Sequence, residues 1–265
     1  MKVYISVDIE GIAGSLDWDE TEIEHPRYAE FRELMTGETL AAIEGAKAAG
    51  ANEIVVKDAH SSGRNILIDR LPADVRIIRG WSGHPFGMVE GLDKSFDAVV
   101  MIGYHASAGS EANALAHTLS GKAVDMRLNG VRVSEAVMHA YAAALVKVPL
   151  AFVSGDAGLC DELNVFNPAI VTLAVKRGTG AATNTMTPAG ARDAIREGVT
   201  SALRGDLKPC LAKLPDTFSL EIIYGDPVTA HKMSFYPGME HAGERKVRLG
   251  TASFYEVLRA LQFVV

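Results

Sequence analysis

Short apolar runs alternate with longer amphipathic segments through the first half of the chain, and this alternation restricts the fold more than any other feature. The runs cover residues 3–7, 53–56, 75–78 and 98–103. Between the first two, the segment 28–49 spaces its apolar side chains for one buried helical face, and Gly50 follows where a helix ends. Strands that alternate with helices predict βαβ units. We therefore predict an α/β fold, with a Rossmann-like, mostly parallel sheet flanked by helices.

The expected strands at 75–78 and 98–103 are mostly apolar, so we predict that helices cover both of their faces. Further along, 150–154 is predicted to be a buried strand and 170–176 another strand. The segment 188–203 has the pattern of a helix.

A hairpin and a second, smaller unit are expected in the rest of the chain. The segment 122–133 alternates around Asn129-Gly130, a strong signal for a two-residue hairpin turn. Ser134 is predicted to cap the helix that follows, which Pro149 stops. Two prolines between 208 and 215 predict a connection into a tail with strands near 218–223 and 245–249 and a helix from Ser253. We predict a main α/β domain at 1–207 and a smaller α+β subdomain at 208–265.

The composition is that of a globular protein. Of the 265 residues, 48% are apolar and 22% charged, which argues against disorder. A formal charge of −7 gives no reason to expect nucleic acid or an anionic membrane as a partner. The apolar start is broken by Asp8 and Glu10, too early for a signal peptide. Cys160 and Cys210 form no CxxC pair and are predicted to be reduced and buried. We expect a cytoplasmic protein.

Polar residues that can bind metal follow three of the predicted parallel strands. The strand ends read VDIEG, VVKDAH and MIGYH, and contribute Asp8, Glu10, His60 and His105. Because ligands bind at the carboxyl ends of the strands in open α/β sheets, these side chains are expected at one edge. Asp8 and Glu10 share a face if the first strand continues that far. Glu135 adds a carboxylate at a helix start. Carboxylates and imidazoles together suit divalent ions such as zinc.

Charge counting favours two ions at this site. The carboxylates of Asp8, Glu10 and Glu135 bring three negative charges, so two divalent ions would leave the site with one positive charge, ready for a hydroxide. A single ion would leave one negative charge, a poorer setting for making hydroxide from water. Paired ions ~3.5–4 Å apart are common in aminopeptidases and other hydrolytic sites.

For three residues near these motifs the sequence allows two different roles. His117 is the second histidine of a loop rich in Gly, Ser and Ala, and is either a general base or acid over the site or an ordinary surface histidine. Asp58 is either a partner that orients an imidazole or a turn residue. Asp156 either binds a substrate amine or caps a helix. Each proposed ligand, taken alone, is more often a cap, a turn residue or a satisfied polar group, and only their recurrence at strand ends favours a metal site.

The motifs resemble those of the D-aminopeptidase (DppA-type) family of zinc metallopeptidases. The residues that carry the resemblance are SVDIEGIAG at 6–14, DAHSSGRN at 58–65, MVEGLDKSFDAVVMIGYHASAG at 88–109, LAHTL at 115–119 and VSGD at 153–156. The resemblance runs from Lys2 to about Ala202 and continues more faintly to the C-terminus. In this family Gly usually precedes the helix-starting glutamate, where this chain has Ser134.

The resemblance implies a zinc-dependent aminopeptidase that acts on short peptides with an N-terminal D-residue, D-alanyl peptides above all. It also implies two zinc ions per subunit and a self-compartmentalised homodecamer of two stacked rings. Carried over by motif, the ligands fall on Asp8, Glu10, His60, His105 and Glu135, with Asp8 between the two ions, and the catalytic histidine falls on His117.

Two other functions stay open on the sequence. The first is a dinuclear metal hydrolase of L-peptides or other small amides. The second is a non-catalytic peptide-binding protein of a transport operon that uses metal as a structural element. A phosphoesterase is disfavoured because Lys57 and Arg64 are the nearest basic residues to the ligand motifs.

Overall fold

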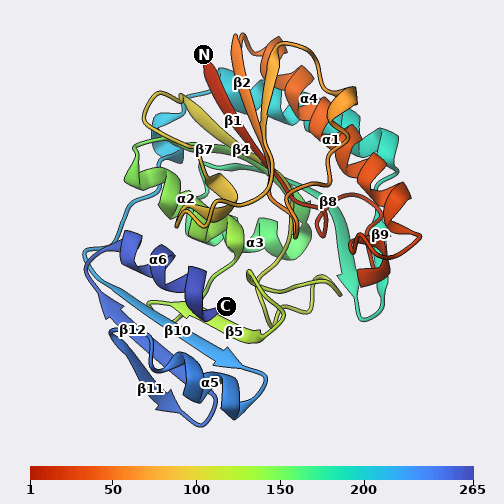
Figure 1. Ribbon diagram of the computed structural model, residues 1–265. Coiled ribbons are helices and arrows are strands. Elements are labelled where there is room, and N and C mark those ends of the chain that lie inside the picture. Colours follow the sequence, from red (N-terminus) through yellow and green to blue (C-terminus); the bar gives the residue numbers. More distant parts are fainter.

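Seven strands form one sheet in the computed structural model, which describes residues 1–265 (Figure 1). In the order β3-β2-β1-β4-β7-β8-β9, every neighbouring pair is parallel except β8 and β9. The predicted Rossmann-like, mostly parallel sheet is confirmed. Its strands are β1 (Lys2–Val7), β2 (Glu53–Asp58), β3 (Val75–Ile78), β4 (Ala98–Tyr104), β7 (Leu150–Asp156), β8 (Val171–Thr179) and β9 (Ala182–Thr185).

Helices cover both faces of this sheet. On one face α1 (Tyr28–Ala48) and α4 (Pro188–Arg204) pack against each other and over Ile5 and Val7 of β1. On the other face lie α2 (Glu135–Leu145) and α3 (Ala157–Phe166), whose apolar side chains share a core with Tyr4 and Met101. None of the helices is both long and apolar enough to span a membrane.

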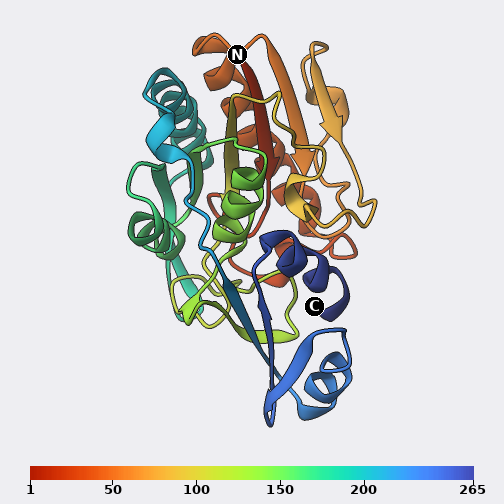
Figure 2. The ribbon, with the colours of Figure 1, turned by 90° about the vertical axis from the view of Figure 1, so that its left-hand side faces the viewer.

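A second, antiparallel sheet has the order β11-β12-β10-β5-β6. Figures 1 and 2 place it at the end of the molecule toward which the parallel strands run. Its strands are β5 (Ala123–Leu128), β6 (Val131–Arg132), β10 (Phe218–Tyr224), β11 (Met239–Gly243) and β12 (Lys246–Thr251), with helices α5 (Pro227–Met233) and α6 (Phe254–Val264). Asn129 and Gly130 both have positive φ, 52° and 82°, as a tight hairpin turn requires, and Leu128 pairs with Val131.

The hairpin β5–β6 joins the C-terminal strands, because β5 pairs with β10 over most of its length. The second sheet is therefore built from two separate parts of the chain. The second sheet does not follow the predicted domain boundary at 207 and 208, because β5 and β6 lie before that boundary. The boundary itself stays a prediction.

The structure corrects one sequence prediction and adds four elements. Strand β4 is buried throughout, but β3 is an edge strand and only partly buried, so the expectation that helices cover both of its faces was wrong. The helix α3 was not predicted, because it follows β7 with no loop between them and no turn segment separates the strand from the helix. The elements α5, β9 and β11 are short and bury few side chains, so no apolar period marks them.

A close backbone contact joins the turn after β1 to the end of β4. The N–H of Asp8 donates to Ile102 O and that of Gly11 to Gly103 O, both at 2.8 Å. A Cβ atom on Gly11 would overlap the carbonyl oxygen of Tyr104. Only glycine fits here, because the obstacle is backbone and cannot rotate away. The contact gives the Gly of the VDIEG motif a structural reason.

We predict that Gly11→Ala lowers the free energy of unfolding by about 3 kcal/mol, because the new methyl group must push two backbone segments apart. The control is Gly250→Ala on β12, where a Cβ would meet nothing within 4 Å and the change should stay below about 1 kcal/mol. Denaturant titration of both variants measures this. Equal stabilities would contradict the steric account.

Candidate metal centre and active site

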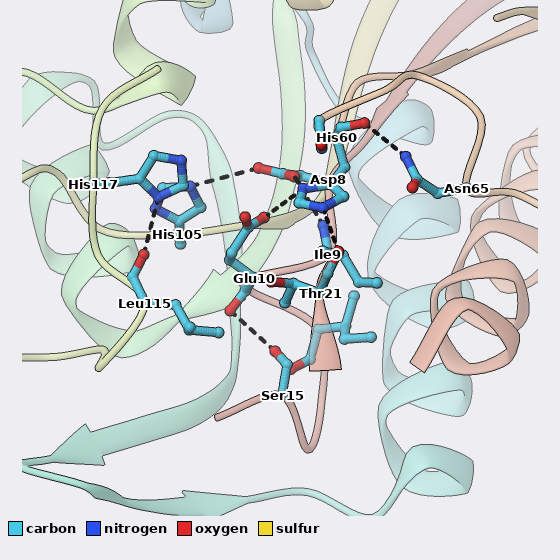
Figure 3. Close-up of polar contacts among 12 residues, drawn as sticks. Asp8, Ile9, Glu10, Ser15, Thr21, His60, Asn65, His105, Leu115 and His117 are labelled. Carbon is cyan, nitrogen blue, oxygen red and sulfur yellow. Dashed lines mark hydrogen bonds and ion pairs between the residues drawn. The ribbon is translucent and has the colours of Figure 1, made fainter. Parts of the chain in front are cut away.

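The carboxyl ends of β1, β2 and β4 bring the predicted ligands together (Figure 3). Asp8 follows β1 directly, His60 lies two residues beyond β2, and His105 follows β4 directly. Their strands are neighbours in the sheet, so the three side chains meet at one edge. This is the convergence that the sequence predicted.

Glu10 reaches the same place by another route than expected. Strand β1 ends at Val7, so the condition under which strand alternation would place Glu10 beside Asp8 is not met. Instead the turn after β1, held against β4 through Gly11, directs the Glu10 carboxylate back to the centre.

Carboxylates and imidazoles alternate across the centre. His60 Nδ1 lies 3.2 Å from Asp8 Oδ1 and 3.0 Å from Glu10 Oε2. His105 Nε2 lies 3.6 Å from Asp8 Oδ2 and 3.4 Å from Glu135 Oε2. Asp8 therefore points one oxygen toward each imidazole. All five side chains are at least nine-tenths buried.

Glu135 occupies the first position of α2, where the helix dipole favours a carboxylate. Ser134 caps this helix, its Oγ accepting from Val137 N, as the sequence predicted. Glu135 Oε1 accepts from Leu119 N at 2.6 Å, a contact that ties the helix start to the loop carrying His117.

His117 lies beside the other residues of the centre. Its ring stacks on that of His105, with centroids 4.3 Å apart and planes 17° apart, and its Nε2 is 3.6 Å from Glu135 Oε1. Trp18 packs edge-on against it at 5.5 Å. Of the two interpretations of His117, the structure contradicts the isolated surface histidine.

Each of the three imidazoles has one nitrogen bonded to a backbone carbonyl. His60 Nε2 pairs with Thr21 O at 2.9 Å, His105 Nδ1 with Ala106 O and His117 Nδ1 with Leu115 O, each at 3.0 Å. A carbonyl oxygen only accepts, so these nitrogens carry hydrogen. The opposite nitrogens face carboxylates and need either a proton or a cation. Metal-binding histidines are commonly held in this way.

The electrostatics of the centre call for positive charge. Burial alone lowers the pKa of His105, but Glu135 and Asp8 raise it to about 10. Burial and the neighbouring Glu10 raise the pKa of Asp8 well above its usual range. Glu10 Oε2 and His105 Nε2 are buried and make no hydrogen bond. A divalent cation would satisfy both atoms, so the donor set fits a metal.

The possible ligand atoms form two overlapping groups, and within each group all of these atoms lie within 4.8 Å of one another. One is Asp8, Glu10 and His105, and the other is His105, His117 and Glu135. His60 lies outside both groups but contacts Asp8 and Glu10. Because His117 belongs to the second group, its distance from the other ligand atoms allows it to bind a metal ion. The same position allows it to accept or donate a proton at the centre.

The centre opens into a cavity of about 680 Å³. Asp8, Glu10, His60, His117 and Glu135 line it, together with side chains from the segment 81–90, from α2 and from α6. A cavity of this size matches those that bind small ligands.

Comparison with known proteins identifies the family. The model of peptidase family M55, described as D-aminopeptidase, matches residues 1–263. The chain belongs to this D-aminopeptidase family. It is 31% identical to the D-aminopeptidase of Bacillus subtilis (strain 168) over 263 residues, 98% of this chain and 95% of that one. The family resemblance seen in the sequence is confirmed, and the chain is a peptidase.

A solved structure of the same family is closely similar. The Zn-dependent D-aminopeptidase DppA from Bacillus subtilis, a self-compartmentalizing protease, matches with a TM-score of 0.92 and 29% identity, over 100% of this chain and 96% of that one. The α/β fold is therefore shared over the whole length, the antiparallel sheet included.

Two acidic residues with open roles prove to be structural in this family member. Asp58 accepts from the backbone of Asn65 and Ile66 and from the Asn65 side chain, so it holds the turn after β2 and bonds to no imidazole. Asp156 is fully buried and caps α3 through Leu159 N, so it is closed to a substrate amine.

A buried network, missed in the sequence, supports the centre from behind. Lys176 Nζ donates to Glu10 O and Ser15 O, both at 2.5 Å, and to Ser15 Oγ at 2.8 Å. Burial lowers its pKa to about 8, although the charge of Asp156 opposes this. The sequence signal that could have indicated Lys176 was its position near the end of β8, since the ends of other strands in this sheet also carry polar residues.

Asn113 connects the two ligand-bearing segments. Its Nδ2 donates to Glu10 O at 3.1 Å and to Asp156 Oδ2 at 2.9 Å. The same Asp156 oxygen accepts from Ala106 N at 2.8 Å, next to His105. Through Asn113 the segment of Glu10 and the segment of His105 therefore hold each other in place.

We predict that Asn113→Ala weakens Zn²⁺ binding by about tenfold or more, because residues that orient metal ligands carry effects of this size. Glu10 O and Asp156 keep their other partners, so the protein should still fold. Competition with a chelator measures the affinity, and Asn184→Ala, exposed on β9, is the control. Unchanged affinity in Asn113→Ala would show that the network does not support the centre.

Proposed function

We propose that this chain is a zinc-dependent aminopeptidase that removes an N-terminal D-residue, of the D-alanine type, from short peptides. The observation that carries the proposal is the buried set of three carboxylates and two imidazoles, from three strand ends and the start of α2, open to a cavity that His117 also lines. Membership of a D-aminopeptidase family supports the substrate class, and the Zn-dependent relative supports the metal.

We propose two zinc ions per subunit. Glu10 and His60 would hold one, His105 and Glu135 the other, and Asp8 would lie between them. The direction of the two Asp8 oxygens toward different imidazoles supports this division. Three carboxylates also leave two divalent ions with one positive charge, which a hydroxide balances.

When bound, zinc would polarise the scissile carbonyl and lower the pKa of a coordinated water. The residues of the chain position the substrate and transfer the protons. His117 Nδ1 donates to Leu115 O, so the lone pair of its neutral form lies on Nε2, on the side of the centre. We propose that this nitrogen accepts a proton from the attacking water and returns it to the leaving amine. Stacking on His105 and the edge contact of Trp18 fix the ring for that task.

An aminopeptidase must also recognise the free amine of its substrate. The cavity presents the carboxylates of Glu22 and Glu90 in addition to those of the centre. A cationic N-terminus is attracted to such a cavity, which favours cleavage at the amino end of a peptide over cleavage within it.

We predict that the zinc-loaded protein hydrolyses D-alanyl p-nitroanilide at least about tenfold faster than the L-enantiomer, because the centre and its walls hold the substrate at several points. Both substrates share one leaving group, and release of p-nitroaniline is followed by absorbance. Faster hydrolysis of the L-enantiomer would favour the L-peptide alternative.

His117→Ala tests the proposed base in the same assay. The rate should fall by about 10²–10⁴-fold, the usual contribution of a positioned acid or base, while the zinc content stays at two per chain. A loss of zinc along with the rate would make His117 a ligand. The control is His241→Ala, whose ring lies exposed on β11.

We also propose that the chain assembles with copies of itself, as a homodecamer. Support comes from the self-compartmentalizing relative and from exposed apolar side chains at the smaller sheet, Val228, Phe235 and Phe263. Light scattering should give a mass ten times the 28.3 kDa of one chain. Phe235→Asp should lower this mass, while Val165→Asp, 85% exposed on α3, should not. A monomer mass for the unaltered chain would exclude the assembly.

A further inference from the structure

Trp81 is a fixed aromatic side chain in the wall of the cavity. It is 42% exposed and lines the cavity, but it is not a freely rotating surface residue. Its indole Nε1 donates to Ser61 O at 2.6 Å, and Ser61 directly follows the proposed ligand His60. The ring is therefore bonded to the turn that carries one of the metal ligands.

The backbone beside Trp81 is bonded to the same turn. Gly80 N donates to Gly63 O, and Gly63 N donates to His60 O, both at 2.8 Å. Gly80 has a positive φ of 72°, a conformation that other residues rarely adopt. A Cβ atom on Gly63 would lie 2.7 Å from Gly80 N, so the two segments pack backbone against backbone. These contacts set the position of Trp81 relative to His60.

A buried lysine supports one face of the indole. Lys57 is fully buried, and its Nζ lies 3.9 Å from the centroid of the Trp81 ring. The same Nζ donates to Gly80 O at 2.5 Å. A cation over an aromatic ring is attracted to its face. With Lys57 on one face and the Ser61 bond at its edge, the ring cannot turn away from the cavity without losing both contacts.

The proposed mechanism indicates which end of the substrate reaches Trp81. His117 lies beside His105 and Glu135, and it returns a proton to the leaving amine, so the leaving residue begins on that side of the centre. The N-terminal residue of the substrate then extends toward the other side, where His60 lies. Trp81 is bonded to the residue after His60, so its ring forms the wall next to the N-terminal residue.

We infer that Trp81 is a specificity-determining residue that limits the size of the side chain on the N-terminal residue of the substrate. This inference rests on the proposed function and gives a physical reason, within it, for a preference for D-alanine. A methyl group fits beside a fixed ring, whereas a longer side chain overlaps the ring. Moving the ring to make room is unfavourable, because its contacts with Lys57 and Ser61 would be lost.

The p-nitroanilides of D-alanine, D-leucine and D-phenylalanine test the inference, because they share one leaving group. For the unaltered zinc-loaded protein, kcat/KM should fall as the side chain grows. In Trp81→Ala the ratio of kcat/KM for the D-leucyl to the D-alanyl substrate should rise at least about tenfold, since even one methylene changes specificity on this scale. Trp81→Phe should give a smaller rise, because a phenyl ring keeps part of the wall.

Trp18 offers a matched control. It is also a tryptophan in the cavity wall and is 41% exposed, but it contacts His117. Trp18→Ala should therefore lower kcat/KM for all three anilides by a similar factor and leave their ratios unchanged. The zinc content of Trp81→Ala should equal that of the unaltered protein, which separates a change in the wall from a loss of metal.

Several results would overturn the inference and leave the proposed function intact. An unchanged ratio in Trp81→Ala would mean that the ring does not contact the side chain, and a lower ratio would mean that it attracts large side chains. An equal rise in Trp18→Ala would show that the effect is not specific to Trp81. If the unaltered protein hydrolyses none of the three anilides, both the inference and the proposed function are wrong.

Discussion

The structure depends on the concentration of negative charge at one edge of its parallel sheet. Asp8, Glu10 and Glu135 are buried within 3.0–3.6 Å of two imidazoles, and each of these imidazoles already donates to a backbone carbonyl. Such a cluster is costly in a protein interior unless cations compensate it. The fold provides the setting by ending three neighbouring strands at the same place and by closing the far side with α2.

Holding this cluster requires rigid support from outside the set of ligands. Gly11 permits the turn after β1 to lie directly on the end of β4, and Asn113 and Asp156 tie the same two segments together from behind. Lys176 holds the segment that follows β1 through Glu10 O and Ser15. The support comes largely from β7 and β8, strands that contribute no proposed ligand. Precision at the centre is therefore a property of the whole sheet edge and of the loops that cross it.

The smaller sheet gives the site its second wall. Its helix α6 lies at the carboxyl end of the parallel strands, next to α2 (Figure 1), and both helices line the cavity. Because β5 and β6 come from the middle of the chain and β10 to β12 from its end, the chain passes between the two sheets three times, after β4, after β6 and after α4. The chemistry thus belongs to the parallel sheet, and the shape of the substrate cavity is shared between both sheets.

Sequence periodicity alone determined the order and type of the main elements, because apolar runs with flanking helices permit few arrangements other than a parallel sheet. It also indicated the candidate ligands, since strand ends of such a sheet converge whatever the loops do. The tertiary structure alone decided what depends on contacts between distant segments. The wall from α6, the stacking of His117 on His105 and the buried Lys176 belong to this group. Their positions follow from packing across more than a hundred residues or from loop conformation, and a local pattern carries no record of either.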